Sequence, residues 1–452
     1  MTEVVVDAQA VEVRIVYGAE EARRTLLRRV PLEEAEPPEH VRARDRRLFG
    51  PGLSVEDVVR RILAAVRAEG DAAVLRFNEA LDGAAPRPLR VSRDEIAAAY
   101  RQVPPDLVEA LRLAAERIRA YHERQLAQGF TAFEHDGLGQ LVRPIQRAGI
   151  YVAGTAAPLP SSLLMTVVPA RVAGVDEVYV ASPALPDGSI PAVKLVAADI
   201  AGVDAVFRAG GAQAIAAFAY GTETVPRVDK IFGPGGLFVT LAKKQVFGTV
   251  GVDNIYGPTE TLVIADADAD PTLCAADLLA QAEHDELASP ILITDAPELA
   301  RQVAEEVRRQ VATLERGPIA AAAFANRGGI VVAASIDEAV QLANEYAPEH
   351  LCLLLRDPWP YVSQVRNAGG VFVGEASPEA LGDYIAGPSH VMPTSGSARW
   401  ASPLSVYDFL KVISLVAVPD AVTQALGGAA ARIARAEGLT AHARALEVRL
   451  GR

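Results

Sequence analysis

Apolar residues follow one pattern before residue 145 and another after it. In the first part they recur at helical spacing from Val55 to Leu81, and again in a segment that opens with Pro104-Pro105. In the second part, short β-rich runs alternate with alanine-rich stretches that have a helical pattern. Strands that alternate with helices of about ten residues predict an open, mainly parallel α/β sheet.

The predicted elements after residue 145 form two successive runs. The first run has predicted strands at 149–152, 177–181, 205–208 and 230–232, with helices near 161–173, 191–201, 212–220 and 236–247. The second has predicted strands at 262–265, 291–294, 330–332, 351–355 and 371–373, with helices near 271–287, 296–313 and 335–346. Two runs of the same kind predict two similar lobes, followed by a helical tail from Val422 that is interrupted at Gly427-Gly428 and Gly438.

The composition indicates a large globular protein with an acidic surface. A chain of 452 residues, half of them hydrophobic, can form about two to three domains. With 44 basic and 57 acidic residues the net charge is −13, which argues against sequence-independent binding to nucleic acid or to anionic membranes. Two cysteines make no disulfide framework, and the N-terminus MTEVVVDAQAVEV has no basic region typical of a signal peptide. We therefore expect a cytoplasmic protein.

One uncharged stretch has the length of a membrane span. Residues 148–170 contain no charged side chain, but they include Pro158, Pro160 and Pro169 and a polar middle. Such a sequence predicts a bend between a strand and a helix rather than a spanning helix. No G-x-G-x-x-G sequence occurs in the chain, so a dinucleotide would have to bind in an unusual way.

Two segments carry adjacent groups that are suited to chemistry. Gln281 and His284 are spaced i, i+3 in a predicted helix, so one face could offer a metal an amide oxygen and an imidazole nitrogen; the alternative is an ordinary helix end. Glu349 and His350 enter a predicted strand and could be general bases, or only a satisfied boundary pair. In an extended segment their side chains would point apart and could serve different steps.

Two further segments are weaker when taken alone. Asp383 lies in a glycine-bracketed loop that could complete a coordination sphere, although a polar turn that ends at a structural His390 fits equally well. Thr440 has the pattern of a helix N-cap, which would place His442 in the first turn of the last helix. Cys352 follows His350 on the same strand face and suggests a rival chemistry, in which a thiolate attacks an aldehyde; a buried strand cysteine is the alternative.

Taken together, the motifs resemble those of the histidinol dehydrogenase family from about residue 50 to residue 445. The shared motifs, in chain order, are PLPSS at 158–162, FRAGGAQAIAA at 207–217, QAEH at 281–284, APEHL at 347–351, GDYIAGPSHVMPT at 382–394, SVYDFLK at 405–411 and EGLTAH at 437–442. The resemblance implies a homodimer with one Zn²⁺ per subunit, which oxidises L-histidinol through histidinaldehyde to L-histidine with two NAD. It also implies two Rossmann-like lobes with incomplete dinucleotide folds, plus small N-terminal and C-terminal helical segments.

The resemblance also assigns roles to individual residues. His350 would be the base for the alcohol step, and Glu349 would activate water in the aldehyde step. The implied zinc ligands are Gln281, His284, Asp383 and His442. The implied substrate contacts are Thr259, Gln281, His284, His350, Asp383, Glu437 and His442, with Tyr151 and Gln213 at NAD. Glu437 and His442 would complete the site of the partner subunit.

We expect residues 1–48 to form an N-terminal helical segment, and residues 49–148 with 260–403 to form a discontinuous first α/β lobe. Residues 149–259 should form a second, NAD-binding α/β lobe, and residues 404–452 a C-terminal helical arm for dimerisation. Three departures from the family pattern bear on the substrate and the cofactor. Gly236 replaces an Asn that contacts NAD, Ala153-Gly154-Thr155-Ala156 replaces Pro-Gly-Gly-Thr, and Thr259 replaces a Ser. The sequence therefore leaves open a related zinc/NAD dehydrogenase of another small diol, such as a sulfonated diol, or of an amino alcohol. A binding protein with a structural metal is a third possibility.

Overall fold

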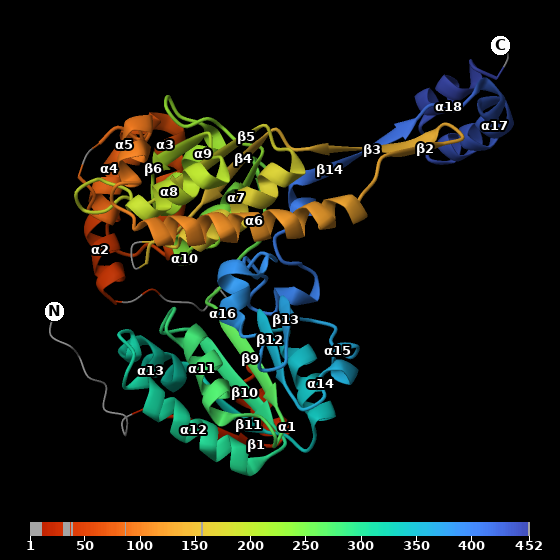
Figure 1. The fold of residues 1–452 in the computed structure, drawn as a ribbon. Helices are drawn as coiled ribbons and strands as arrows, with labels where there is room; N and C mark the ends of the chain where they lie inside the picture. Colours follow the sequence, from red (N-terminus) through yellow and green to blue (C-terminus); the bar gives the residue numbers. More distant parts are fainter. Residues whose placement is uncertain (1–10, 30–36, 38, 86, 155–156, 451–452) are drawn as a thin grey trace.

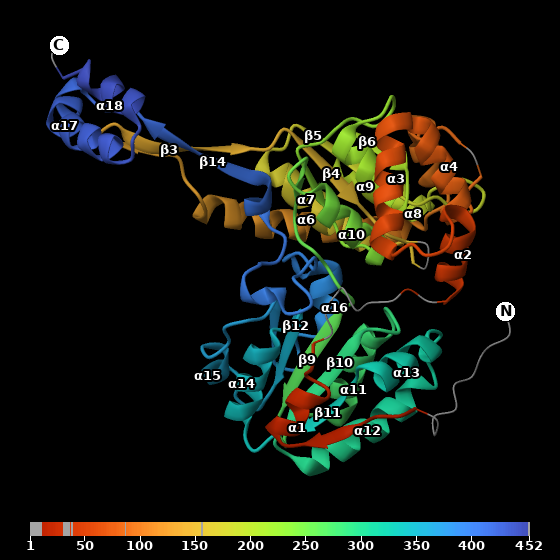
Figure 2. The same ribbon diagram turned by 180° about the vertical axis from the view of Figure 1, so that it is seen from behind.

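The computed structural model describes residues 11–29, 37, 39–85, 87–154 and 157–450. The described chain forms two α/β lobes and an arm that projects from one of them (Figures 1 and 2). The prediction that the N-terminus is not a signal peptide concerns residues 1–10, which lie outside the described residues. Thr155 and Ala156 of the predicted bend also lie outside them. No helix in the described ranges is long and apolar enough to cross a membrane.

Sheet A forms the centre of one lobe, and all its strands are parallel. Its strand order is β1 (Ile15–Tyr17), β11 (Gly329–Val332), β10 (Ser289–Thr294), β9 (Glu260–Ala265), β12 (His350–Leu354) and β13 (Gly370–Val373). One face is covered by α11 (Pro271–Ala282), α12 (Pro297–Val311) and α13 (Gly317–Asn326). The other is covered by α1 (Ala19–Arg24) and α14 (Ile336–Tyr346). Strands buried on both faces explain the continuous apolar runs in the sequence.

Sheet B forms the centre of the second lobe and is also parallel. Its strand order is β6 (Ala205–Arg208), β5 (Glu177–Ser182), β4 (Arg147–Tyr151), β7 (Lys230–Phe232) and β8 (Gly251–Val252). On one face lie α6 (Pro105–Gln128), α7 (Pro160–Ala173) and α8 (Ala192–Ala201). On the other lie α3 (Val55–Glu69), α4 (Asp71–Asp82), α9 (Gly211–Tyr220) and α10 (Leu237–Val246).

The helices before residue 130 belong to a different lobe from the one expected. We expected residues 49–148 to share a lobe with 260–403, but the buried side chains of α3, α4 and α6 pack on sheet B. An amphipathic helix shows in its sequence that one face is buried, not which sheet covers that face. The N-terminal segment differs too, because it contributes strand β1 to the edge of sheet A beside β11 as well as helices α1 and α2 (Glu39–Phe49).

The arm is a long antiparallel ribbon with helices at its tip (Figures 1 and 2). It pairs β14 (Leu410–Val416) with β3 (Leu138–Pro144), and β3 with β2 (Phe133–His135). Helices α17 (Asp420–Ala436) and α18 (Thr440–Glu447) pack on each other at the tip. Only the helices of this region were expected from the sequence.

Several predicted helices differ from the observed ones at glycines and at their ends. The periodic stretch 55–81 is broken at Gly70, whose φ is +57°, into α3 and α4. Helix α17 runs through Gly427-Gly428 and ends before Gly438, whose φ is +77°. The N-cap of α18 is Leu439 rather than Thr440, but His442 still lies in the first turn. The predicted helix 271–287 ends at Ala282, so His284 lies just beyond it.

Candidate active site between the two sheets

A pocket of about 220 Å³ lies between the two lobes and contains most of the candidate residues. From sheet A it is lined by Thr259, which precedes β9, and by His350, the first residue of β12. From sheet B it is lined by Ser162 at the start of α7 and by Pro234 after β7. Open α/β sheets usually bind ligands at the carboxyl ends of their strands. Sheet B follows this rule, whereas sheet A lines the pocket with the amino ends of its strands.

Glu349 and His350 share this pocket and are almost fully buried, at 7% and 3% exposure. Glu349 precedes β12 rather than lying within it, so the two side chains do not point apart as expected; Glu349 Oε2 lies 3.7 Å from His350 Nδ1. Glu349 Oε2 accepts hydrogen bonds from the Thr259 hydroxyl at 2.8 Å and from the Glu260 N–H at 3.0 Å. His350 Nδ1 lies 3.0 Å from the Glu260 carbonyl oxygen, and it must donate because a carbonyl only accepts.

The buried surroundings of this pair shift the pKa of both groups. Burial raises the pKa of Glu349 to about 7, although His350 and the Thr259 hydroxyl partly offset this effect. Burial alone would lower the pKa of His350, but the carboxylates of Glu379, Glu349 and Asp383 raise it well above its ordinary value. Glu349 is thus a carboxylate whose pKa is suited to accepting a proton near neutrality.

Gln281, His284 and Asp383 also line the pocket. Gln281 lies in the last turn of α11, His284 follows that helix, and Asp383 belongs to a π-helical turn, Gly382–Ala386. Gln281 Nε2 donates to Asp383 Oδ2 at 3.2 Å, and His350 Nε2 lies 3.4 Å from Asp383 Oδ1. Desolvation lowers the pKa of His284, which favours the neutral imidazole that can bind a metal.

The two predicted metal or substrate residues on the arm do not reach this pocket within one subunit. Glu437 is the C-cap residue of α17 and His442 lies in α18, and both side chains are exposed at the tip of the arm. In the part of the chain that the structure describes, no three His, Cys, Asp or Glu side chains are grouped so that they could hold a metal ion. Of the four predicted metal ligands, the pocket of one subunit contains the His284 imidazole, the Asp383 carboxylate and the Gln281 amide.

The predicted cofactor residues lie at the carboxyl edge of sheet B. Tyr151 ends β4, and its hydroxyl accepts a hydrogen bond from the Gly211 N–H at 3.2 Å. Gln213 Nε2 donates to Asn78 Oδ1 at 3.3 Å and to Asp82 Oδ2 at 3.0 Å, and Asn78 donates in turn to the Arg208 carbonyl. This chain of bonds leaves Gln213 Oε1 buried without a partner among the described residues. Sequence reasoning missed Asn78 and Asp82, because nothing local marks their contact with Gln213.

Gly236, where the family pattern has Asn, is the N-cap of α10. A Cβ atom added to it would meet no atom within 4 Å, so the missing side chain leaves open space beside the helix N-terminus. The structure therefore shows no steric reason for the glycine, and nothing else in it explains this substitution.

Cys352 lies outside the pocket beneath His350. Its thiol is fully buried and donates to Glu379 Oε1 at 2.9 Å. Burial and the neighbouring carboxylates of Glu379 and Asp277 raise the pKa of the thiol well above its ordinary value, which disfavours the thiolate. His390 connects the two lobes, because its ring nitrogens lie 2.6 Å from the Asp383 carbonyl and 3.1 Å from Ser162 Oγ.

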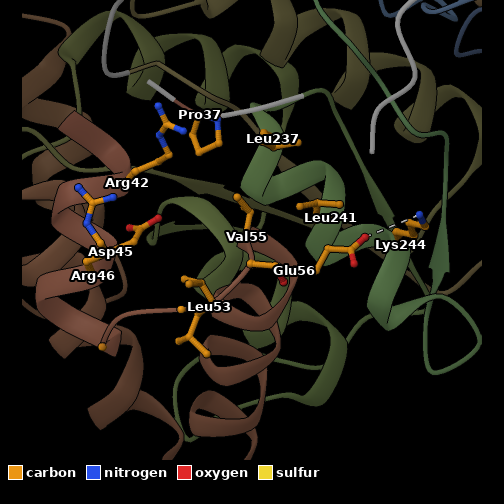
Figure 3. A pocket seen from close by; sticks show the side chains of 14 residues that line it. Pro37, Arg42, Asp45, Arg46, Leu53, Val55, Glu56, Leu237, Leu241 and Lys244 are labelled. Carbon is orange, nitrogen blue, oxygen red and sulfur yellow. Dashed lines mark ion pairs between the residues drawn. The ribbon is translucent and has the colours of Figure 1, made fainter. Parts of the chain in front are cut away.

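A second cavity, of about 450 Å³, lies between α2, the start of α3 and α10 (Figure 3). Its lining mixes both charges, including Arg42, Arg46, Asp45 and the ion pair between Glu56 and Lys244. None of the residues predicted to act in catalysis or metal binding lines this cavity. The smaller pocket between the sheets is therefore the candidate active site, although the cavity near α10 is larger.

Comparison with known proteins agrees with the motifs in this pocket. The family model described as histidinol dehydrogenase matches residues 51–450. The histidinol dehydrogenase of Deinococcus radiodurans is 52% identical over 440 residues, which cover 97% of this chain and all of that protein. The one from Thermus thermophilus is 52% identical, with 91% of this chain and 98% of that protein covered. A crystal structure of histidinol dehydrogenase from Elizabethkingia anophelis has a TM-score of 0.87 at 34% identity, covering 97% of this chain and 98% of that one.

Proposed function

The chain belongs to the histidinol dehydrogenase family, and we propose that it oxidises L-histidinol through histidinaldehyde to L-histidine in two NAD-linked steps. The observation that supports this most strongly is the position of Glu349 and His350. Both lie in one buried pocket with Gln281, His284 and Asp383, opposite the carboxyl edge of the other sheet. A pair of bases next to a set of metal-binding groups is suited to proton removal from a held alcohol and from water.

The side chains in the pocket fit a zinc ion. Imidazole, carboxylate and amide oxygen are all zinc-binding groups, although an amide is uncommon. The Thr259 hydroxyl lies 2.9 Å from Gln281 Oε1 and 2.8 Å from Glu349 Oε2, yet it has one hydrogen for these two acceptors. Rotating the Gln281 amide by 180° removes this conflict, because Nε2 then donates to Thr259 and Oε1 faces Asp383.

The rotated amide would place an oxygen where a nitrogen now lies 3.2 Å from Asp383 Oδ2. Two oxygens at this separation could bind the same metal ion. Gln281, His284 and Asp383 would therefore hold the ion, which would supply a fixed positive charge that orients the substrate. His442 from the arm of a second subunit would be the fourth ligand, and Glu437 beside it would contact the substrate.

The lobe around sheet B fits NAD, which would accept the hydride in each step. The buried Gln213 Oε1, which has no partner among the described residues, is an acceptor close to Gly211 at the N-terminus of α9. A nucleotide hydroxyl or amide could donate to it, because Asn78 and Asp82 fix the orientation of the Gln213 amide. Tyr151 would contact NAD at the carboxyl edge of the sheet, beside the N-terminus of α9.

His350 would accept the proton of the substrate alcohol. Its Nδ1 is occupied as a donor to the Glu260 carbonyl, so Nε2 is the nitrogen that is directed toward Asp383 and the pocket. A metal ion held by Asp383 would offset its negative charge, so that this carboxylate would hold a proton on Nε2 less strongly. The imidazole can then act as a base for the alcohol step.

Glu349 would accept a proton from the water that attacks the aldehyde. Its pKa of about 7 leaves a large ionised fraction at neutral pH and still makes the carboxylate a much stronger base than an exposed one. The Thr259 hydroxyl and the Glu260 N–H hold Oε2, which leaves Oε1 to contact the water.

The arm is suited to joining two subunits. It carries exposed apolar side chains along the ribbon and at its tip, among them Val416, Leu426, Ile433 and Val448. Because α17 and α18 contact little of their own lobe, a second copy of the chain is the natural partner for this surface. Glu437 and His442 would then reach the pocket of that partner.

The decisive experiment is the stoichiometry of the reaction. The purified zinc-loaded protein is given a limiting amount of L-histidinol with excess NAD, and NADH and the final product are quantified. We expect two NADH for each histidinol and histidine as the product. One NADH with the aldehyde as end product would refute the second oxidation, and turnover of another small diol without turnover of histidinol would favour the alternative dehydrogenase.

A further inference from the structure

We propose that Arg29 is a positioning residue for the Glu349–His350 pair, an inference that rests on the proposed function. Arg29 comes from the N-terminal segment, outside residues 51–450 that the family model matches. That segment is anchored independently of Arg29, because β1 pairs with β11 and because Ala22, Leu26 and Leu27 are buried on sheet A.

The Arg29 guanidinium fixes the turn that leads into the catalytic pair. Its Nη2 donates to the carbonyl oxygens of Tyr346 at 2.6 Å and Ala347 at 3.2 Å, and the guanidinium carbon lies 3.6 Å from the centre of the Tyr346 ring. These carbonyls end α14, where a cation is favoured. Ala347 has a left-handed φ of +54°, and Glu349 follows two residues later. Arg29 thus holds a strained turn directly before the proposed base.

The same guanidinium neutralises a buried carboxylate behind the pair. Arg29 Nη1 forms an ion pair with Glu260 Oε1, which also accepts the Ser395 N–H at 2.9 Å. Glu260 is buried, and its backbone holds both bases, since its N–H donates to Glu349 and its carbonyl accepts from His350. One arginine therefore supports the residue whose main chain orients both proposed catalytic groups.

The ion pair also sets the electrostatic surroundings of Glu349. Within the pocket Glu349 is faced by His350 from β12, by Thr259 and Glu260 at the start of β9, and by Tyr256 from the preceding loop, with Asp383 on the far side of His350. The negative charge of Glu260 opposes ionisation of Glu349. The Arg29 cation reduces that repulsion. Loss of Arg29 should therefore raise the pKa of Glu349, so that the carboxylate can accept a proton only at higher pH.

The test is the pH dependence of aldehyde oxidation in Arg29→Met. With histidinaldehyde and NAD as substrates, we expect the acidic limb of kcat to move up by at least about half a pH unit. We expect kcat at pH 7 to fall at least about twofold, as a half-unit shift from a pKa of about 7 requires, while KM stays unchanged, because the residue acts on the base and not on substrate binding. Arg29→Lys should recover part of the shift, since it restores the charge without the two-pronged contact.

Two further variants separate this role from a merely structural one. Arg23→Met removes a neighbouring, exposed ion pair with Glu345 on the same segment, and it should leave the pH profile unchanged. In a Glu260→Gln background, which lacks the opposing charge, Arg29→Met should shift the acidic limb by much less. A folded Arg29→Met enzyme with an unchanged profile, or with activity lowered equally at every pH, would overturn the proposal.

A failure of the proposed function can be distinguished from a failure of this inference. If the wild-type protein does not oxidise histidinaldehyde, the proposed function fails, and the inference is judged by the unfolding free energies of Arg29→Met, Glu260→Gln and the double variant. If the two changes in unfolding free energy are coupled, the proposed role of Arg29 in holding Glu260 is supported. If they are additive, that role is refuted.

Discussion

Replacing Glu349 by Gln should stabilise the metal-free protein at alkaline pH. In the folded chain, burial raises the pKa of this carboxyl from 4.5 to about 7. At pH 4 the group is protonated in both folded and unfolded chains, so its ionisation costs nothing. As the pH rises from 4.5 to about 7, the unfolded chain loses this proton and the folded chain keeps it, so the folded state loses stability.

The size of the effect follows from the pKa shift. At about 1.4 kcal/mol per pKa unit, the difference between 4.5 and about 7 corresponds to roughly 3 kcal/mol at pH 8. A glutamine keeps the local hydrogen bonds, because its side-chain oxygen, in the place of Oε2, can accept from both the Glu260 N–H and the Thr259 hydroxyl. Glu349→Gln should therefore be more stable than the wild type by about this amount at pH 8, and equal to it near pH 4.

Urea unfolding of chelator-treated protein at pH 4, 6 and 8, followed by far-UV circular dichroism, measures this difference. Glu286→Gln is a matched control, because that glutamate is exposed in the same lobe and its removal should change stability little at any pH. A stability difference between Glu349→Gln and wild type that does not grow with pH would refute the reasoning. In the zinc-loaded enzyme the same variant should lose about 10²–10⁴-fold in aldehyde oxidation, as expected for removal of a general base.

The remaining predictions address His350 and Cys352, the site shared between subunits, and the buried ion pair of Lys243 with Asp253, which packs against Tyr256 of the pocket lining. His350→Ala should lose about 10²–10⁴-fold in histidinol oxidation and still oxidise added histidinaldehyde. Cys352→Ser should keep most of its activity. A Cys352→Ser protein that is folded and metal-loaded but inactive would contradict the Glu/His mechanism. Lys243→Met should lower the free energy of unfolding by about 3–5 kcal/mol in urea titrations, because it leaves the buried Asp253 charge unpaired, and a loss below about 1 kcal/mol would contradict this reading. Inactive His442→Ala and His350→Ala proteins, unfolded and refolded together, should regain histidinol oxidation, since each mixed dimer would contain one site with neither substitution; no recovery in proven mixed dimers would refute a site shared between subunits.

The sequence predicted most of the central strands and the chemical groups of the pocket, because these have local signals. Apolar runs bounded by helices identified the strands, and the Glu349-His350 and Gln281/His284 spacings identified candidate groups. The position of Glu349 outside the strand could not be predicted, since the left-handed turn at Ala347 has no glycine to mark it. Nor could the contact of Arg29 with Glu260, which depends on how a distant N-terminal segment packs against sheet A.

The opposite use of the two sheet edges explains how one pocket can suit both a metal and a dinucleotide. Helices that connect parallel strands run antiparallel to those strands. The C-terminal ends of α11 and α14 therefore lie at the amino edge of sheet A. Their partial negative charge favours cations, which are Arg29 at α14 and the proposed metal beside Gln281 and His284. The carboxyl edge of sheet B gathers the N-terminal ends of α7, α9 and α10, whose partial positive charge favours phosphate groups. The two lobes therefore face each other with edges of opposite partial charge. The edge of sheet A favours the proposed metal ion, and the edge of sheet B favours the phosphate groups of the proposed cofactor.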